Sequence, residues 1–174
     1  MSGEAGPSVA ARDDLAGVVD LFEWLTREEL SRAVSELAFK RRAEADAAAI
    51  DAAIDVAVAE YALVPAPREA LSTEGDGIGE EAEPLAVGPA AFPSLPANAE
   101  DLPHILDVPE RAVDRETLSA AVIDRLSSDA VAAITEENAE RLEVLADVTY
   151  DVEAWAPVDA GPIRERIVAE LDGE

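Results

Sequence analysis

The residues best suited to bind a charged ligand are five cations near the start of a strongly acidic chain. Residues 26–42 hold five basic and three acidic residues, whereas the 174-residue chain carries a formal net charge of −26. Guanidinium and ammonium groups gathered in this way bind phosphate or carboxylate groups. The segment is therefore a candidate partner-binding face, made of Arg27, Arg32, Lys40, Arg41 and Arg42. The alternative is local neutralisation, by the dipole of the helix end and by Glu23, Glu28 or Glu36.

The helix expected to follow this segment argues against direct reading of DNA. It carries five carboxylates and has no basic residue after Arg42. A recognition helix needs Arg, Lys, Asn or Gln to contact base edges, and carboxylates are repelled by the phosphate backbone. A protein partner is therefore favoured over nucleic acid. The carboxylates are Glu44, Asp46, Asp51, Asp55 and Glu60.

Residue types that carry catalysis are scarce. The chain has no cysteine and one histidine, His104, which lies beside Pro103. The glycine-rich stretch from Gly75 to Gly79 is followed by glutamates rather than lysine, so it does not form a phosphate-binding loop. Asp51 and Asp55 lie one helical turn apart, but such pairs arise by chance among thirty-nine acidic residues, and no EF-hand spacing is present. We therefore expect no enzyme activity, no catalytic residue and no cofactor or metal site.

The acidity itself indicates adaptation to concentrated salt. Thirty-nine acidic residues face thirteen basic ones, and Lys40 is the single lysine. Molar salt shortens the Debye length to about 3 Å and screens the mutual repulsion of these charges. Two other interpretations are a nucleic-acid mimic and a cation buffer. Both are disfavoured because the acidic residues are spread along the chain, without the run of five or six like charges that marks an acidic tail.

The distribution of apolar residues predicts a cytoplasmic protein. Residues 1–12 have neither the basic start nor the apolar middle of a signal peptide. No apolar stretch reaches the roughly 18 residues that a membrane-spanning helix needs. Only seven aromatic residues occur, so the core must be built mainly from small residues, and we expect Trp24, Phe39, Tyr61 and Trp155 to anchor it.

Three helices are expected to position the basic segment. Apolar spacing predicts them over residues 13–24, 26–42 and 46–61. Thr26 and Glu29 have the spacing of a capping box at the start of the second helix. The apolar pieces 62–64 and 85–87 could then pair as a short β-hairpin. This order of elements resembles that of a winged helix; the alternative is a three-helix bundle followed by an extended linker.

The rest of the chain is expected to be a Pro/Gly-rich segment followed by helices. Residues 65–98 hold six of the eleven prolines, which predicts a long wing or a linker, with disorder near 72–83. Further helices are expected from Arg115 to about Leu126, with a brief turn through Ile134, from a cap at Thr135, and from Pro162. Residues 148–153 also alternate as a strand would. The fold class is thus mainly α, with a flexible tail at 1–12, a winged-helix-like unit at 13–64, a wing or linker at 65–98 and a helical unit at 99–174.

The N-terminal block also resembles a known family. The stretches Asp14–Phe22, Leu25–Leu30 and Ser35–Arg41 are similar to the opening of an uncharacterised haloarchaeal protein family of unknown function. The resemblance is clearest over residues 13–64 and implies a cytoplasmic, salt-adapted archaeal protein. It implies no catalytic residues, because the matching motifs are helix faces and caps.

Two functions remain after these exclusions. The first is a non-enzymatic protein-interaction or regulatory module adapted to high salt. The second is a nucleic-acid-associated transcriptional regulator that uses the face from Arg27 to Arg42. They differ in the partner that this face would contact, which is a protein in the first case and nucleic acid in the second.

Overall fold

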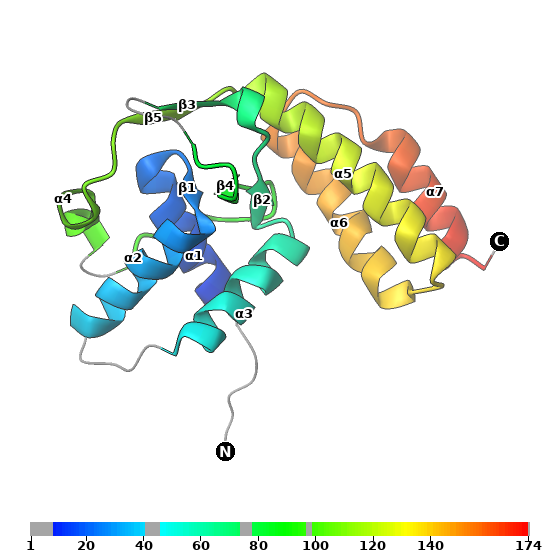
Figure 1. Cartoon of the computed structure of the whole chain (residues 1–174). Helices are drawn as coiled ribbons and strands as arrows, with labels where there is room; N and C mark the ends of the chain where they lie inside the picture. The colour runs from blue at the N-terminus through cyan, green and yellow to red at the C-terminus, as the bar shows by residue number, and fades with distance from the viewer. Residues whose placement is uncertain (1–8, 41–45, 74–77, 97–98, 174) are drawn as a thin grey trace, which may run out of the picture. The chain divides into compact units, whose positions relative to one another are not determined.

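The protein is mainly helical and divides into two compact units between Asp114 and Arg115 (Figure 1). The computed structural model describes residues 9–40, 46–73, 78–96 and 99–173. The prediction of a mainly α fold is confirmed. Within the described residues, no helix is both long and apolar enough to cross a membrane.

The first unit combines helices with two small antiparallel sheets. Its main helices are α1 (Val9–Phe22), α2 (Arg27–Lys40) and α3 (Ala47–Ala59), and a short α4 (Leu102–Leu106) follows later. The strands are β1 (Leu25–Thr26), β2 (Leu63–Pro65), β3 (Leu71–Thr73), β4 (Pro84–Val87) and β5 (Arg111–Val113). Its described residues also form two 3₁₀ turns, η1 (Arg68–Ala70) and η2 (Ala99–Asp101).

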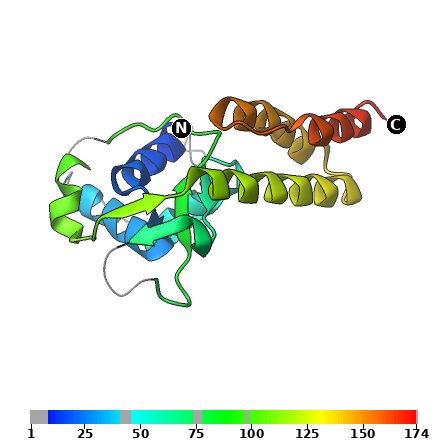
Figure 2. The same ribbon diagram turned by 90° about the horizontal axis from the view of Figure 1, so that it is seen from above.

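The larger sheet has the strand order β1–β4–β2. The two apolar pieces expected as strands are antiparallel neighbours in it, with Leu63 opposite Val87. On the other side of β4, Leu25 lies opposite Leu85, which makes Leu25–Thr26 a strand that the sequence did not predict. The smaller sheet pairs β3 with β5 (Figure 2).

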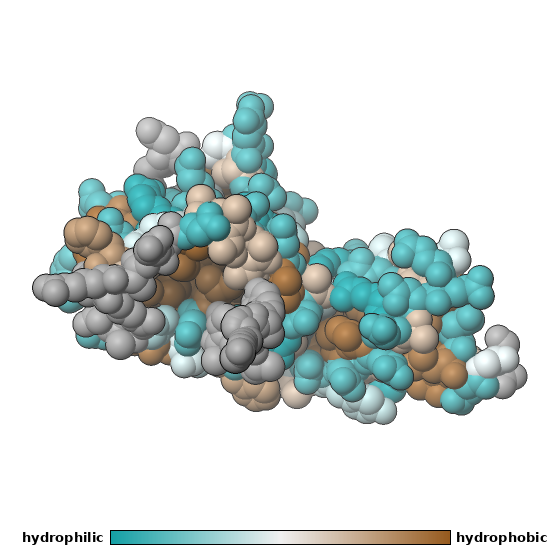
Figure 3. Space-filling view, turned by 90° about the horizontal axis from the view of Figure 1, so that it is seen from below, coloured by the Kyte–Doolittle hydropathy of each residue, from teal (hydrophilic) through white to brown (hydrophobic). Residues whose placement is uncertain are grey.

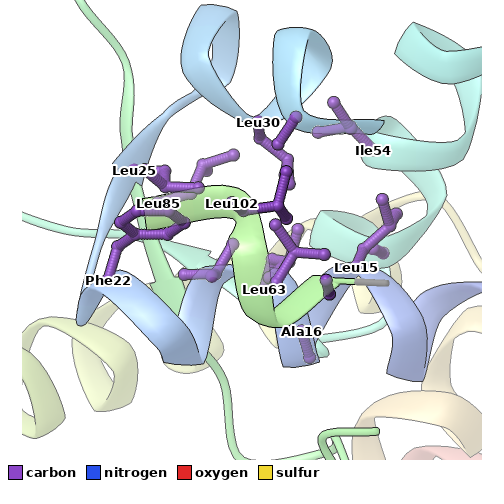
Figure 4. Packing of buried hydrophobic residues seen from close by; sticks show 14 of the residues in the cluster. Leu15, Ala16, Phe22, Leu25, Leu30, Ile54, Leu63, Leu85 and Leu102 are labelled. Carbon is purple, nitrogen blue, oxygen red and sulfur yellow. The ribbon is translucent and has the colours of Figure 1, made fainter. Parts of the chain in front are cut away.

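The core of the first unit lies between the three long helices and the larger sheet (Figure 4). Most of its members are aliphatic or alanine, as expected for a chain with few aromatics. Trp24 and Tyr61 are buried as predicted. The prediction for Phe39 is wrong, because this side chain is 79% exposed. The residues labelled in Figure 4 are Leu15, Ala16, Phe22, Leu25, Leu30, Ile54, Leu63, Leu85 and Leu102.

Residues 88–96 run across α1 in close backbone contact. Asp13, which was expected near the start of the first helix, lies inside it instead, because α1 begins at Val9. Its backbone carbonyl accepts a hydrogen bond from Ser94 N (3.0 Å) and its Oδ1 accepts one from Phe92 N (3.1 Å). One turn later, a Cβ on Gly17 would lie 2.0 Å from Ser94 O, so only glycine fits there.

The second unit is made of three helices, α5 (Arg115–Thr135), α6 (Ala139–Trp155) and α7 (Gly161–Leu171). The last begins with Pro162 in its first turn, as predicted. Residues 148–153, for which a strand was the alternative, are helical. The buried side chains that line its interior are Leu118, Val122, Leu126, Leu142, Leu145, Val148, Val152 and Ile167.

The break expected between residues 126 and 135 does not occur. Helix α5 continues to Thr135, whose hydroxyl donates to Val131 O (2.9 Å) inside that helix and so does not cap the next one. The cap of α6 is Asn138, whose side chain accepts a hydrogen bond from Arg141 N (3.0 Å). No proline or glycine lies between Leu126 and Thr135, so nothing interrupts the backbone ladder of α5.

The segment boundaries differ from those expected. Residues 9–12 of the expected tail belong to α1, and the rest of that tail lies outside the described residues. The Pro/Gly-rich segment contributes β4, the central strand of the larger sheet. Residues 99–113 belong to the first unit because Ala99, Leu102 and Leu106 are part of its core. Of the stretch expected to be disordered, 74–77 lie outside the described residues.

Candidate functional site

The predicted capping box starts the helix that carries the basic face. Thr26 N donates to Glu29 Oε1 (3.0 Å), and Glu29 N donates to Thr26 Oγ1 (3.2 Å). Each residue thereby satisfies a backbone N–H that the first turn of a helix leaves unpaired. The cap places Arg27 at the first position of α2 and Arg32 somewhat over one turn later.

Arg27 is neutralised within the first unit. Its two terminal nitrogens bind Asp51 Oδ1 (2.7 Å) and Asp55 Oδ1 (2.8 Å) of α3, and its Nε lies 3.8 Å from Glu83 Oε1. Burial lowers the pKa of this guanidinium, but the hydrogen bonds to Asp51 and Asp55 outweigh burial, and the pKa is raised above its ordinary value. These partners, two from α3 and Glu83, differ from Glu23, Glu28 and Glu36, which the sequence suggested.

Arg32 is exposed and makes no hydrogen bond or ion pair with any residue that the structure describes. Of the other three predicted cations, Arg41 and Arg42 lie outside the described residues, and the backbone of Lys40 is described at the end of α2. The structure therefore brings Arg27 and Arg32 to one face, and within the described residues Arg32 has no carboxylate partner.

Both arginines line a groove of about 890 Å³. One wall is the first half of α2, the other is the segment 78–83, and Asp51 and Arg111 complete it. The lining carries three guanidinium groups and six carboxylates, so its net charge is negative. Glu28, Glu80 and Glu81 have no ion-pair partner among the described residues.

Arg111 is the residue that sequence reasoning missed. Its side chain is 7% exposed and binds both carboxylate oxygens of Glu29 (2.7 and 2.9 Å). It also donates to Trp24 O (3.1 Å) and stacks over the Trp24 ring at 3.9 Å. The Trp24 indole N–H in turn donates to Ser72 O (3.3 Å). No local signal could have found this, since Arg111 follows Glu29 by 82 positions.

These contacts change the pKa of the Glu29 carboxylate. Burial raises its pKa, but hydrogen bonds from Arg111 and from the backbone and side chain of Thr26 lower it, and the net effect is a pKa below the ordinary value. One side chain thus both caps α2 and receives the buried cation of β5. Glu29 joins the start of α2 to the smaller sheet.

The groove offers charged contacts and no recognisable catalytic arrangement. Its lining contains neither histidine nor cysteine, and its one serine, Ser31, has no base beside it among the lining residues. His104 is exposed on α4. In the described part of the chain, no group of three or more His, Asp or Glu side chains is arranged to hold a metal ion. What the groove can do is recognise charge.

The second unit contains two stacked arginine–aromatic pairs. Arg115 lies over the Trp155 ring at 4.8 Å, and Trp155 is half-buried beside a surface groove. Arg164 lies over the Tyr150 ring at 3.9 Å and binds Glu153 Oε1 (2.6 Å). Hydrogen bonds from Arg164 and from Ala160 N lower the pKa of Glu153. These contacts join α6 to α5, to α7 and to the loop between α6 and α7.

Comparison with known proteins identifies a family for this chain. The model of a family described as being of unknown function (DUF7109) matches residues 13–172. No curated protein and no solved structure matches the chain.

Proposed function

Because the chain belongs to the DUF7109 family, whose function is unknown, we propose a function from the geometry alone: a non-enzymatic protein-interaction or regulatory module adapted to high salt. We place it in the cytoplasm of a salt-adapted archaeon. The composition supports this setting, since a −26 chain with a single lysine stays hydrated and is screened best in concentrated salt.

We further propose that the first unit is a winged-helix-like module. Two features support this: the element order α1–β1–α2–α3–β2–β4 along the chain, and the sheet order β1–β4–β2. In the sheet, β4, the last of these strands in the sequence, lies between β1 and β2. In this arrangement α3 takes the place of the helix that reads DNA, and the part of the chain that connects β2 to β4 takes the place of the wing.

The observation that carries the proposal is the pairing of Arg27 with Asp51 and Asp55. The described α3 has no basic side chain, and its Asp51 and Asp55 neutralise Arg27 by forming ion pairs with it. A nucleic acid approaching α3 would therefore meet neutral or negative groups. A protein partner fits better, and the groove beside α2 is the docking surface that we favour. Its unpaired carboxylates favour a positively charged segment of that partner, while Arg32 supplies one opposite charge that fixes its register.

The second candidate is a nucleic-acid-associated transcriptional regulator. Arg32 supports it, because this exposed cation has no partner among the described residues and lies on the same helix as Lys40. With Arg41 and Arg42 it would form the phosphate-contacting face. Arg27 is the weakest member of that face, since releasing it from Asp51 and Asp55 would expose two carboxylates.

The test compares both partners in molar KCl. Full-length protein is cross-linked in native extract, and in parallel is titrated with DNA and RNA in a gel-shift assay. We expect the cross-linking to recover a protein partner in stoichiometric amount and the gel-shift assay to show no shift of DNA or RNA. The E80Q/E81Q/E83Q variant should lose the partner, whereas E136Q/E143Q/E165Q, which removes the same charge from exposed sites in the second unit, should retain it. A shift abolished by Arg32→Ala would replace the protein-interaction proposal with the nucleic-acid one.

A further inference from the structure

One arginine holds the outer wall of the groove. The Arg68 guanidinium donates to four backbone carbonyl oxygens of a single short segment. Its Nη2 binds Gly79 O (2.7 Å), Glu80 O (2.9 Å) and Ala82 O (3.3 Å), and its Nη1 binds Ile78 O (3.3 Å). A planar fork with five donors can collect several acceptors in this way, which an ammonium group on a flexible stem cannot match.

The segment 78–83 needs such a support. It forms no strand or helix ladder of its own, and Ala82 N donates a hydrogen bond to Gly79 O (3.1 Å) within it. It also carries Glu80, Glu81 and Glu83, whose like charges favour an open conformation. At its far end, Glu83 O accepts from Arg27 N (2.9 Å). The segment is therefore attached to α2 at one end, while Arg68 holds its middle.

We propose that Arg68 is a positioning residue, which holds residues 78–82 in one conformation and thereby forms the acidic wall that the partner reads. It would contribute without touching the partner, since its donors point to backbone carbonyls. Its positive charge, bound to the backbone of the segment that carries the three glutamates, also offsets their mutual repulsion. The binding part of this inference rests on the proposed function, whereas the conformational part stands alone.

The first experiment measures amide exchange at Ala82 by NMR in molar KCl. We expect Arg68→Ala to raise its exchange rate about tenfold or more, because losing even one net charge-assisted hydrogen bond shifts an opening equilibrium by that factor. Arg68→Lys should recover only a small part of the protection. Millimolar methylguanidinium should restore it in Arg68→Ala, and methylammonium should not. Unchanged exchange in Arg68→Ala, or equal rescue by the two cations, would overturn the proposal.

The matched control is Arg166→Ala. Arg166 is exposed in the second unit and has no bonding partner among the described residues, so its removal changes the net charge equally. It should leave Ala82 exchange unchanged. Thermal unfolding of both variants separates local from global effects, since a positioning role requires faster exchange at Ala82 without a matching rise in core amides such as that of Leu63.

The second experiment tests binding with an acetylated, amidated tetra-arginine peptide. In the native protein we expect chemical-shift changes confined to residues 28–32 and 79–83, and in Arg68→Ala we expect them to weaken at least about threefold, since the wall is no longer held. Shifts spread over all acidic surfaces would contradict the groove as docking surface and thus the proposed function. In that case the exchange rate of the Ala82 amide would still test the conformational role of Arg68. Equal peptide binding by both proteins would overturn the binding role of Arg68.

Discussion

At the scale of single residues, the contact between Arg111 and Glu29 is the most consequential one. Both side chains are largely buried, at 7% and 17% exposure, and they share two hydrogen bonds. Taking two charges out of water costs free energy that only good geometry and further hydrogen bonds offset. The bonds from Thr26 N and to Trp24 O provide these. The pair therefore favours one arrangement of α2 and β5, and breaking it should cost more than breaking an exposed pair.

We predict that Arg111→Met lowers the free energy of unfolding by about 3 kcal/mol, because it leaves a buried carboxylate without its cation. Urea unfolding at constant molar KCl, followed by far-UV circular dichroism, measures this. Arg166→Met provides the control and should change stability by less than about 0.5 kcal/mol. A coupling energy near zero between Glu29→Gln and Arg111→Met in a double-mutant cycle would contradict this assignment.

The pH dependence supplies an independent readout of the same pair. Because the folded-state pKa of Glu29 lies below its ordinary value of 4.5, its contribution is fully present above pH 4.5. It is lost as the pH falls through the folded-state pKa. The stabilities of the native protein and of Arg111→Met should therefore converge below pH 4.5. A difference that stays constant there would show that Arg111 stabilises mainly by packing on Trp24.

At the scale of elements, the passage of residues 88–96 over α1 depends on a glycine. Gly17→Ala would set a Cβ 2.0 Å from Ser94 O, and backbone cannot move aside as a flexible side chain can. Alanine gains up to about 1 kcal/mol in helix propensity, which the clash must exceed. We predict a net loss of about 1–3 kcal/mol, as for other overpacked sites, measured by thermal unfolding. Gly79→Ala, where a Cβ meets nothing within 4 Å, should be neutral.

Elements that depend on neighbouring residues were predictable from the sequence. The capping bonds between Thr26 and Glu29, the course of α3, and strands β2 and β4 each follow from residues a few positions apart. The errors in α5 and α6 have the same local origin. Thr135 has a suitable side chain for a cap, but Asn138 follows three residues later and takes that role. Phe39 lies two positions beyond Leu37 and therefore points away from the buried stripe of α2.

Features made by distant parts of the chain were not predictable. Strand β1 exists because Leu25 lies opposite Leu85, and two residues carry no periodic signal. At the candidate site, the sequence indicated Arg27 and Arg32 and raised neutralisation as an alternative. It could not show that Asp51 and Asp55 neutralise only the first. Arg68 and Arg111 escaped notice because their partners are 10 to 14 and 82 positions away.

At the scale of the whole molecule, the described arginines are mostly used within their own unit. Arg12 binds Glu60 (2.8 Å), and Arg164 binds Glu153 (2.6 Å), in addition to the pairs of Arg27 and Arg111. Each of these arginines is neutralised by a carboxylate, although the chain has three acidic residues for every basic one. The remaining carboxylates occur along the whole sequence, and the face shown in Figure 3 mixes hydrophilic with hydrophobic side chains. The surplus of negative charge is therefore not confined to one segment.

This surplus predicts that the fold depends on salt. At about 10 mM ionic strength the Debye length is about 30 Å, so the carboxylates of one unit repel one another over long distances. Molar salt reduces that range to about 3 Å. We expect the helical circular dichroism signal to fall as KCl is lowered from molar to millimolar. E136Q/E143Q/E165Q should shift the midpoint of this salt-dependent transition to lower KCl, because it removes three of the repelling charges.

Sucrose separates charge screening from the general effect of solutes that are excluded from the protein surface. It strengthens the burial of apolar groups without screening charge. If screening dominates, sucrose at millimolar KCl fails to restore the helical signal. Two results would show that the −26 charge does not limit stability: full restoration by sucrose, or a signal that stays unchanged across the KCl series.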